Sequence, residues 1–476
     1  MVHTYHAQAN NYTDIALATL DENFRAYAQE RREFGTLIST ILLRFFSMCL
    51  MLMALAGYGL VEAGSVRERN TKNILAKNLI TSTVGGMTWW GLGYATAYGE
   101  GAKNNEANEF LGGTNFFSNG MDDSVDAEWY ARWSVNWVFS CVPIVIVSGA
   151  IAGRCKMHIY PASSVFLVGF IYPTVVHWCW STEGWLSPFR TNDEGEIEPL
   201  LGANGFIDFS GSGIVHMTGG GVAFLGTWIV GSRNGRFLPD GTVARMEPYS
   251  LPLATAGTLL IWFSWYGFNT GMVEEFKDMD YVCKIAVSST LAASSSGLSA
   301  MLLHAAVKRE VDIISVLRGI VAGLVSISSS VIIVETHMAA AIGIAAGLVY
   351  KSTSMLLLWL RIDDVLDAVP VHYFCGLLGC LAAGLLGTKE DTTEMYGASP
   401  GDYGYFYGAP PDQLILQCIG AASITGWVMF TSFFFFKFMD IFDYFRLSAK
   451  EEREGLGRDR GLDHPRRHPS LPKLLD

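Results

Sequence analysis

Two histidines stand in otherwise apolar stretches of this sequence, and an aspartate precedes each of them by eight residues. The first pair is Asp208 and His216, and the second pair is Asp364 and His372. Ionisable side chains are expensive in hydrocarbon and usually mark a permeation path or a proton relay. Histidine suits a relay because one neutral ring can both donate and accept a hydrogen bond. A single such histidine is as often a packing residue, so the repetition is what favours a function.

The composition predicts that these pairs lie inside a membrane. Half of the 476 residues are hydrophobic, 50 are glycine, and 16% are charged, whereas soluble domains carry about a quarter charged residues. A bilayer core about 30 Å thick needs roughly 20 apolar residues for each helix that crosses it. We therefore expect an all-α membrane protein with eleven transmembrane helices. Their expected positions are 38–61, 78–99, 129–152, 160–181, 206–231, 251–272, 282–306, 313–331, 333–351, 365–387 and 412–438.

Loop charges predict the orientation of these helices. Arg67 and Lys72 follow the first span, whereas Glu100 and Asp122 follow the second, and basic and acidic loops continue to alternate. Because basic loops favour the cytoplasmic side, the N-terminus is expected outside and the C-terminus inside, which requires an odd number of spans. The expected parts are an extracellular segment (1–36), a membrane domain (37–438) and a cytoplasmic regulatory tail (439–476).

The spacing of the Asp–His pairs predicts an internal repeat. Eight residues of helix rise about 12 Å, which would place each aspartate near one end of its span and each histidine near the middle. The two pairs are five spans apart. Because five is odd, the second half enters the membrane upside down, as in transporters built from inverted repeats. The expected plan is two inverted five-helix repeats followed by an eleventh helix.

Several motifs in this order resemble the ammonium transporter family (Amt/Mep/Rh), especially its plant-like eukaryotic branch. The resemblance covers about residues 45 to 465. Besides the two Asp–His segments, the motifs are Glu62-Ala-Gly-Ser-Val-Arg67 with Asn70, Asn136-Trp-Val-Phe139, His177-Trp-Cys-Trp180, Trp265-Tyr-Gly-Phe-Asn269, and Arg446-Leu-Ser-Ala-Lys-Glu-Glu followed by Gly455.

The resemblance implies an outer recruitment site for NH4+. Phe139 and Trp180 match its aromatic residues, whose faces attract a cation. Met272 occupies the position where the family normally has a serine. Since methionine has at best a weak acceptor, the expected entrance lacks one hydroxyl.

The resemblance also implies a gate and a pore below that site. Phe139 and Phe268 match the stacked phenyl gate, His216 and His372 match the twin histidines, and Trp265 matches an aromatic residue that lines the lumen. Each phenylalanine alone is typical of an apolar core.

The resemblance also implies structural and regulatory residues. Asp208 and Asp364 match buried acids that support the site without touching the ion, and Asp208 also suits the start of a helix as its cap. Gly455 belongs to a tail that resembles the family's trans-activation tail. Asp459 lies near the position where relatives carry a regulatory threonine.

The implied function is transport of ammonium or ammonia across a lipid bilayer by a plasma-membrane homotrimer. NH4+ would lose a proton, NH3 would cross, and the proton would follow. The alternatives are an ammonium receptor and a passive gas channel of the Rh type. The net charge of −12 argues against nucleic acid as a partner. The cysteines lack metal-ligand spacing, and no motif predicts an enzyme. Asn11 begins a possible glycosylation sequon.

Overall fold

The computed structural model describes residues 2–99, 108–119, 127–192, 194–273, 279–397 and 402–455. Within the first helix, the side chains of residues 2–23, 28, 30, 32 and 33 lie outside the described set. The side chain of Asn11 and the whole of Asp459 therefore lie outside the described residues.

The described residues are helical, apart from loops and three isolated bridges between extended residues. The longer helices are α1 (Val2–Ser65), α2 (Thr71–Thr88), α4 (Ala127–Ala150), α7 (Thr218–Val230), α8 (Leu251–Thr270), α9 (Met279–Lys308), α10 (Ile313–Ile327), α11 (Thr336–Trp359), α12 (Cys375–Leu386) and α14 (Asp412–Ile441). The shorter helices are α3 (Tyr94–Tyr98), α5 (Ile159–Phe166), α6 (Tyr172–Trp180), α13 (Lys389–Tyr396) and α15 (Ala449–Glu454), with 3-10 turns η1 (Glu68–Asn70), η3 (Phe116–Ser118) and η8 (Tyr405–Tyr407).

Four π-helical segments interrupt or begin these helices. Segment η2 (Trp89–Gly93) joins α2 to α3, and η4 (Leu167–Ile171) joins α5 to α6. Segment η5 (Ser212–Met217) begins α7, and η7 (Val369–Phe374) begins α12. Short π-helical turns frequently mark functional sites, and the last two contain His216 and His372.

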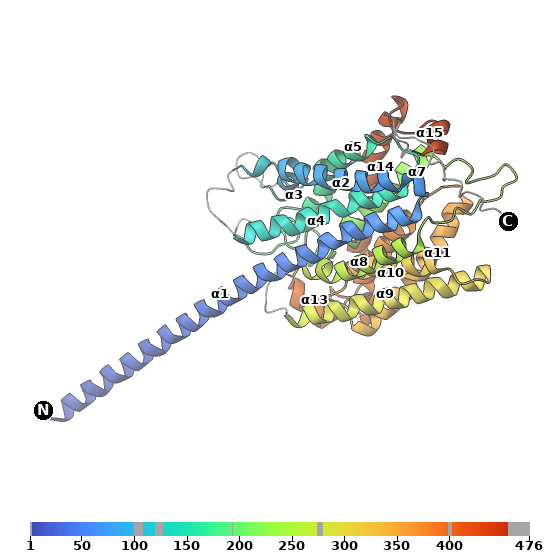
Figure 1. The fold of residues 1–476 in the computed structure, drawn as a ribbon. Helices are drawn as coiled ribbons and strands as arrows, with labels where there is room; N and C mark the ends of the chain where they lie inside the picture. Colours follow the sequence, from blue (N-terminus) through green and yellow to red (C-terminus); the bar gives the residue numbers. More distant parts are fainter. Residues whose placement is uncertain are drawn as a thin grey trace, which may run out of the picture.

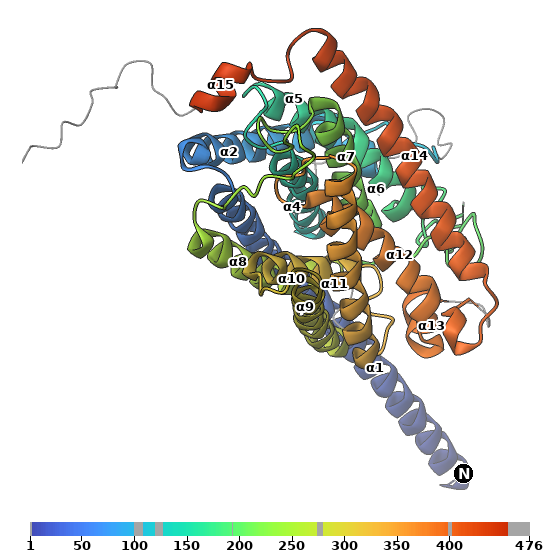
Figure 2. The same cartoon turned by 90° about the vertical axis from the view of Figure 1, so that its right-hand side faces the viewer.

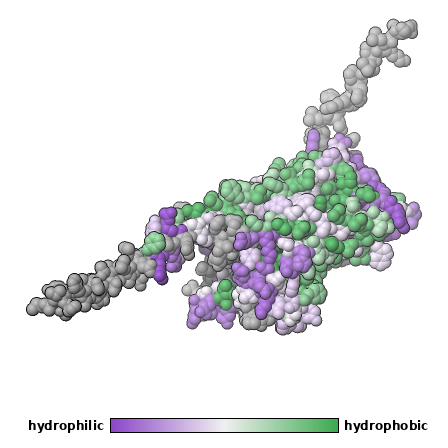
Figure 3. All heavy atoms as spheres, turned by 90° about the horizontal axis from the view of Figure 1, so that it is seen from below, coloured by the Kyte–Doolittle hydropathy of each residue, from purple (hydrophilic) through white to green (hydrophobic). Residues whose placement is uncertain are grey.

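The helices form one bundle that suits a bilayer. Among the described residues, eight helical stretches are long and apolar enough to cross a membrane, and α10 is a shorter apolar helix. Large apolar side chains such as Leu79, Trp359 and Phe430 are exposed, and Figure 3 shows a broad hydrophobic band with hydrophilic residues toward the ends. In water a surface of this kind would be unfavourable, so the chain is a multi-pass membrane protein.

The bundle has two groups of helices. Helices α1, α8, α9, α10 and α11 lie on one side, and α2, α4, α6, α7, α12 and α14 lie mainly on the other (Figure 2). Helix α1 packs on α8, and α9 packs on α10 and α11. Helix α1 also projects far beyond the bundle, and its N-terminal end points away from α15 (Figure 1).

Some predicted boundaries were wrong. The fifth span was expected at 206–231, but its helical part begins at Ser212, so Asp208 lies outside the helix. The eighth and ninth spans were expected to meet near Ser328, but residues 328–335 form turns between α10 and α11. Helix α1 runs without interruption from Val2 to Ser65, and the expected division at residue 36 between an extracellular segment and the membrane domain stays a prediction.

Candidate functional site

The two aspartates of the repeated motif each hold the start of a histidine-bearing segment. Asp208 accepts hydrogen bonds at Oδ2 from the backbone N–H groups of Gly213 (2.9 Å) and Ile214 (2.8 Å). Asp364 accepts one from the N–H of Val369 at 2.7 Å. In both motifs the acid satisfies an N–H five residues later, and so acts as a cap for a helix start that would otherwise be unsatisfied. The prediction that acid and histidine share one helix was therefore wrong.

The two histidines meet at the centre of the bundle. The Nδ1 atoms of His216 and His372 are 3.2 Å apart, and the ring centroids are 5.2 Å apart with planes inclined by 22°. Both rings are buried. The two capped segments come from different halves of the chain, and the fold brings these histidines, 156 positions apart, into direct contact.

Glycines allow the two segments to approach so closely. Gly220 follows His216 by four residues, and a Cβ there would lie 2.4 Å from the backbone nitrogen of Tyr373. Gly376 follows His372 by four residues, and a Cβ there would lie 2.4 Å from the backbone oxygen of Ser212. Only glycine fits at such a helix crossing. The shared His-x-x-x-Gly spacing was visible in the sequence but was not used.

Aromatic rings continue the line of side chains from His216. Trp265 stacks on His216 with centroids 5.3 Å apart and planes inclined by 14°, and its Nε1 donates to Ser328 Oγ at 3.1 Å. Phe268 lies 4.6 Å from Trp265, and Phe139 lies 4.5 Å from Phe268 at an interplanar angle of 61°. Phe139 and Phe268 are fully buried, so the passage between them is closed to water.

Trp180 lies beyond this closure and is fixed by Asp208. Its Nε1 donates to the backbone oxygen of Asp208 at 2.9 Å, and its ring contacts Phe139 edge-on with centroids 5.6 Å apart. Asp208 therefore fixes Trp180 through its carbonyl and the start of η5 through its carboxylate. One residue couples the position of the entrance aromatic to the position of His216.

A cavity opens above Trp180, and we call it the Trp180 vestibule. It measures about 680 Å³ including its open mouth. Its lining residues are Arg44, Tyr98, Arg132, Val135, Asn136, Trp180, Thr182, Phe189, Gly271 and Met272. Met272 and Trp180 thus line the same cavity, and a role of either in recruitment stays a prediction. Phe139 is not in the lining, and Val135, one helical turn earlier, faces the cavity.

Two arginines in the Trp180 vestibule were not expected. Arg44 of α1 lies 3.5 Å from Oε1 of Glu128, and Arg132 of α4 lies 3.4 Å from the same oxygen. The carboxylate thus offsets part of their positive charge. Arg44 had a sequence signal, because it is the one charged residue within the expected span 38–61.

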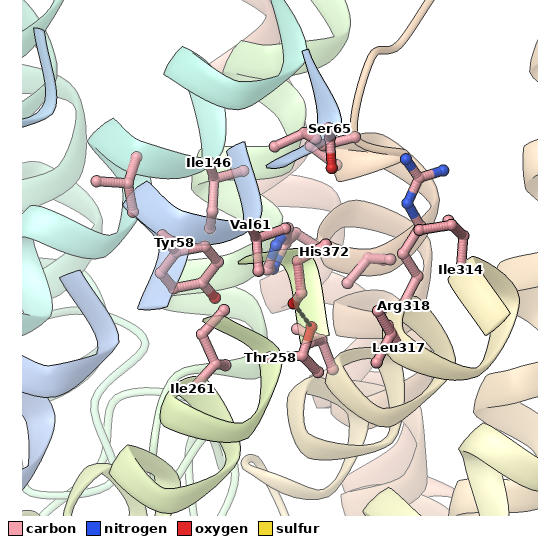
Figure 4. Close-up of a pocket in the computed structure, with 16 residues that line it drawn as sticks. Tyr58, Val61, Ser65, Ile146, Thr258, Ile261, Ile314, Leu317, Arg318 and His372 are labelled. Atoms are coloured by element: carbon pink, nitrogen blue, oxygen red, sulfur yellow. Dashed lines mark hydrogen bonds between the residues drawn. The ribbon is translucent and has the colours of Figure 1, made fainter. Parts of the chain in front are cut away.

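A second cavity reaches His372 from the opposite end, and we call it the His372 cavity. It measures about 560 Å³ including its mouth, and its walls are mostly aliphatic. Figure 4 shows His372 between Tyr58 on one side and Leu317 and Arg318 on the other. The Tyr58 ring centroid lies 6.0 Å from that of His372.

An ion pair borders the His372 cavity. Arg318 Nη1 donates to Asp367 Oδ2 at 2.5 Å, and its Nη2 donates to the carbonyl of Val365 at 3.1 Å. Tyr350 donates to the same carboxylate oxygen at 3.3 Å. These bonds connect α10 and α11 to the turn before η7. Because η7 contains His372, the same contacts fix both the cavity wall and the position of His372.

The loops at this end of the bundle converge on Asp363. Its carboxylate accepts hydrogen bonds from the backbone N–H of Arg233 (2.9 Å) and from its Nε (2.7 Å) and Nη2 (2.8 Å). Arg154 donates to the Asp363 carbonyl at 2.7 Å. Burial alone would raise the pKa of Asp363, but the hydrogen bonds and charges of Arg233 and Arg154 outweigh it and lower the pKa to about 2.

The C-terminal tail packs on the same loops. Arg446 donates to the carbonyls of Val230 (2.6 Å) and Ser232 (2.7 Å). Glu452 is buried and accepts hydrogen bonds from the backbone and side chain of Asn234 at 2.7 and 2.8 Å. Gly455 follows α15 with φ +81°, against the side chain of Arg69. The tail is therefore part of the folded unit as far as residue 455.

Among the described residues, no group of three or more His, Cys, Asp or Glu side chains is placed to hold a metal ion. The described site consists of aromatic rings, two imidazoles and backbone-bound carboxylates. Such a set suits a small cation or a neutral amine better than a metal ion.

The profile of the Ammonium Transporter Family matches residues 41–460. The chain belongs to this family. It is 35% identical over 413 residues to "Ammonium transporter 1 member 1" of Arabidopsis thaliana, covering 84% of this chain and 79% of the relative. It is 31% identical to "Ammonium transporter 3" of Dictyostelium discoideum, covering 84% and 88%.

Two solved structures superpose on most of this chain. A "Sensor Amt Protein" superposes with a TM-score of 0.78 at 27% identity, covering 89% of this chain and 98% of that one. Mep2 of Candida albicans superposes with a TM-score of 0.73 at 23% identity, covering 87% of both chains, and this likeness concerns the fold. The predicted family is therefore confirmed.

Proposed function

We propose that this family member transports ammonium by admitting NH4+ to the Trp180 vestibule and passing NH3 to the His372 cavity. Membership of the ammonium transporter family makes ammonium transport its function. The observation that carries the mechanism is the uninterrupted order of the Trp180 vestibule, the Phe139–Phe268 contact, the two histidines and the His372 cavity.

The closed phenyl pair gives selectivity. K+ and NH4+ have the same charge, but only NH4+ can release a proton and become neutral. Moving an intact cation through a dry apolar constriction costs at least several kcal/mol, whereas NH3 avoids most of that cost. Phe139 and Phe268, which are fully buried, therefore favour a step in which the nitrogen is neutral.

The histidine pair gives the neutral molecule polar partners below the gate and gives the proton a route. His216 and His372 share a hydrogen-bond contact, and each neutral ring has one donor and one acceptor nitrogen. A proton passed along this pair would travel with the nitrogen, and transport would then be electrogenic. Asp208 and Asp364 act as structural acids, since both carboxylates accept backbone N–H groups.

The remaining parts of the proposal concern topology and assembly. Eleven transmembrane helices in two inverted repeats plus a last helix would place the N-terminus and the Trp180 vestibule outside. The His372 cavity and the tail would then face the cytoplasm. The alternation of basic and acidic loops supports this orientation. The proposal includes a homotrimer in the plasma membrane, with residues 439–476 as a regulatory tail.

A second candidate function is ammonium sensing with little flux. Two observations favour it: the likeness to a protein described as a sensor, and Met272 in the vestibule where a hydroxyl is expected. The described tail is bound to the membrane domain through Arg446 and Glu452. A passive gas channel of the Rh type remains a third possibility that the same experiment separates.

Voltage clamp of oocytes expressing the protein, combined with uptake of labelled ammonium, tests these candidates. A saturable inward current that matches uptake supports electrogenic transport. Uptake without current would contradict proton transfer and support a gas channel. Neither current nor uptake, with retained ammonium binding by the purified protein, would overturn transport in favour of sensing.

A further inference from the structure

We propose that the hydroxyl oxygen of Tyr98 is the hydrogen-bond acceptor that holds NH4+ in the Trp180 vestibule, in place of the hydroxyl that Met272 lacks. The inference rests on the proposed function, because it concerns how the same entrance binds its substrate. It assigns a substrate-binding role to a residue outside the line of aromatic rings and histidines.

Tyr98 is placed where such an acceptor is needed. It stands at the last residue of α3 and lines the same vestibule as Trp180 at the end of α6 and Met272 just after α8. A cation bound over the face of Trp180 is attracted electrostatically, but a π face does not separate NH4+ from K+. An oxygen acceptor adds a directional N–H···O bond to NH4+, which carries four N–H donors, although oxygen lone pairs also coordinate K+.

The hydrogen bonds around Tyr98 make its oxygen an acceptor toward the vestibule. Asn136 donates through Nδ2 to the backbone carbonyl of Arg132 at 3.0 Å, which leaves Oδ1 of its amide as the acceptor. The hydroxyl of Tyr98 donates to that Oδ1 at 2.8 Å. A phenol has a single proton, and here Asn136 receives it. Toward any further group the Tyr98 oxygen can therefore only accept.

Packing holds this acceptor in one position. Asn136 is buried, and the Tyr98 ring packs on that of Tyr94 with centroids 5.3 Å apart. Tyr94 in turn contacts Trp129 edge-on at 5.4 Å. An acceptor fixed before the ion arrives needs no reorganisation on binding, so more of its interaction free energy appears as affinity.

The test compares Tyr98→Phe with the wild type in two assays, the ammonium current in oocytes and stabilisation of the purified protein by ammonium chloride against sodium chloride. A hydrogen bond to a charged group is stronger than one between neutral groups, and a solvated vestibule reduces its contribution. We expect the apparent KM and Kd for ammonium to rise about ten-fold, with the maximal current within about two-fold of the wild type.

Tyr94→Phe is the matched control, because it removes a hydroxyl one turn earlier on the same helix, outside the vestibule lining. It should leave KM and Kd unchanged. Met272→Ser supplies a hydroxyl on the facing wall, so it should restore most of the affinity lost in Tyr98→Phe and tighten the wild type only slightly. A merely structural effect of Tyr98→Phe would not be rescued in this way.

The outcomes separate this inference from the transport proposal. If the wild type binds ammonium but carries no current, transport fails, and the Kd of Tyr98→Phe still decides the role of Tyr98. An unchanged Kd and KM in Tyr98→Phe would overturn the inference. So would equal losses in Tyr94→Phe, or a loss in Tyr98→Phe that Met272→Ser leaves as it is.

Discussion

The Nδ1 atoms of His216 and His372 lie 3.2 Å apart, so the two imidazoles share a hydrogen bond and cannot both present Nδ1–H. In the neutral pair one ring is the Nδ1–H tautomer and the other is the Nε2–H tautomer. Nε2 of His216 is buried, and no described protein group forms a hydrogen bond with it. In the proposed mechanism, this nitrogen is the polar atom that a passing NH3 would meet.

Replacing both histidines tests this position. His216→Ala with His372→Ala should either stop ammonium flux or admit K+, because the relay is lost and an open cavity remains. Voltage clamp in ammonium and in potassium, with surface expression measured in parallel, distinguishes the two results. Ammonium flux and selectivity equal to those of the wild type would rule out the relay.

The sequence was sufficient to predict that the polar residues at the centre of the bundle belong together. Histidines and aspartates in apolar spans are unfavourable unless they serve a purpose, and their equal spacing in two places showed that they belong together. The structure brings together His216, His372 and Trp265 as the resemblance implied.

The sequence did not predict how those residues are supported. The spacing was interpreted as one regular helix, but Asp208 caps a π-helical start through backbone N–H groups of Gly213 and Ile214. Periodicity reports which residues are apolar and does not report where a helix begins. The vestibule was also missed, because Arg44 and Tyr98 reach it from helices far apart in the chain and only tertiary packing brings them together.

The glycine crossing yields a second prediction. Gly376→Ala should force η5 and η7 apart, since its Cβ would lie 2.4 Å from the Ser212 carbonyl. Overpacking of this kind costs about 1–3 kcal/mol and would also disturb the contact between the histidines. We expect reduced flux and a lower thermal midpoint in detergent.

Gly426→Ala is the control for this crossing. Gly426 lies within α14, and a Cβ there would have no heavy atom within 4 Å. Alanine is the better helix former, so this variant should be as stable as the wild type and fully active. Equal behaviour of the two variants would show that the crossing tolerates a methyl group.

Asp363 predicts a pH dependence of stability at the loop end of the bundle. Because its pKa is lowered to about 2, its ionised form stabilises the fold above the ordinary pKa of about 4. That contribution is lost as the pH falls from about 4 toward 2. The difference between the pKa values of Asp363 in the folded and the unfolded chain corresponds to ~2 kcal/mol of folding stability.

Asp363→Asn should therefore lower the thermal midpoint at pH 7, and the difference from the wild type should shrink below about pH 4. Glu247→Gln is a useful comparison, since Glu247 lies exposed in the loop after α7 and forms only a surface ion pair with Arg245, and such pairs contribute little to stability. A difference for Asp363→Asn that stays constant down to pH 2 would contradict ionic stabilisation by Arg233 and Arg154.

Gly455 is predicted to couple the tail to the membrane domain. Its φ of +81° and ψ of 149° are nearly restricted to glycine, and a Cβ would lie 2.7 Å from the Arg69 side chain. Gly455→Asp should therefore release the end of α15 from the loop after α1. Flux should be lost although the protein still reaches the membrane.

Gly397→Asp is the matched control, because Gly397 also has a positive φ, of +67°, but a Cβ there would have no heavy atom within 4 Å. Ammonium currents normalised to surface protein should be near zero for Gly455→Asp and unchanged for Gly397→Asp, and full currents in both would mean that tail docking at Arg69 is not required for transport.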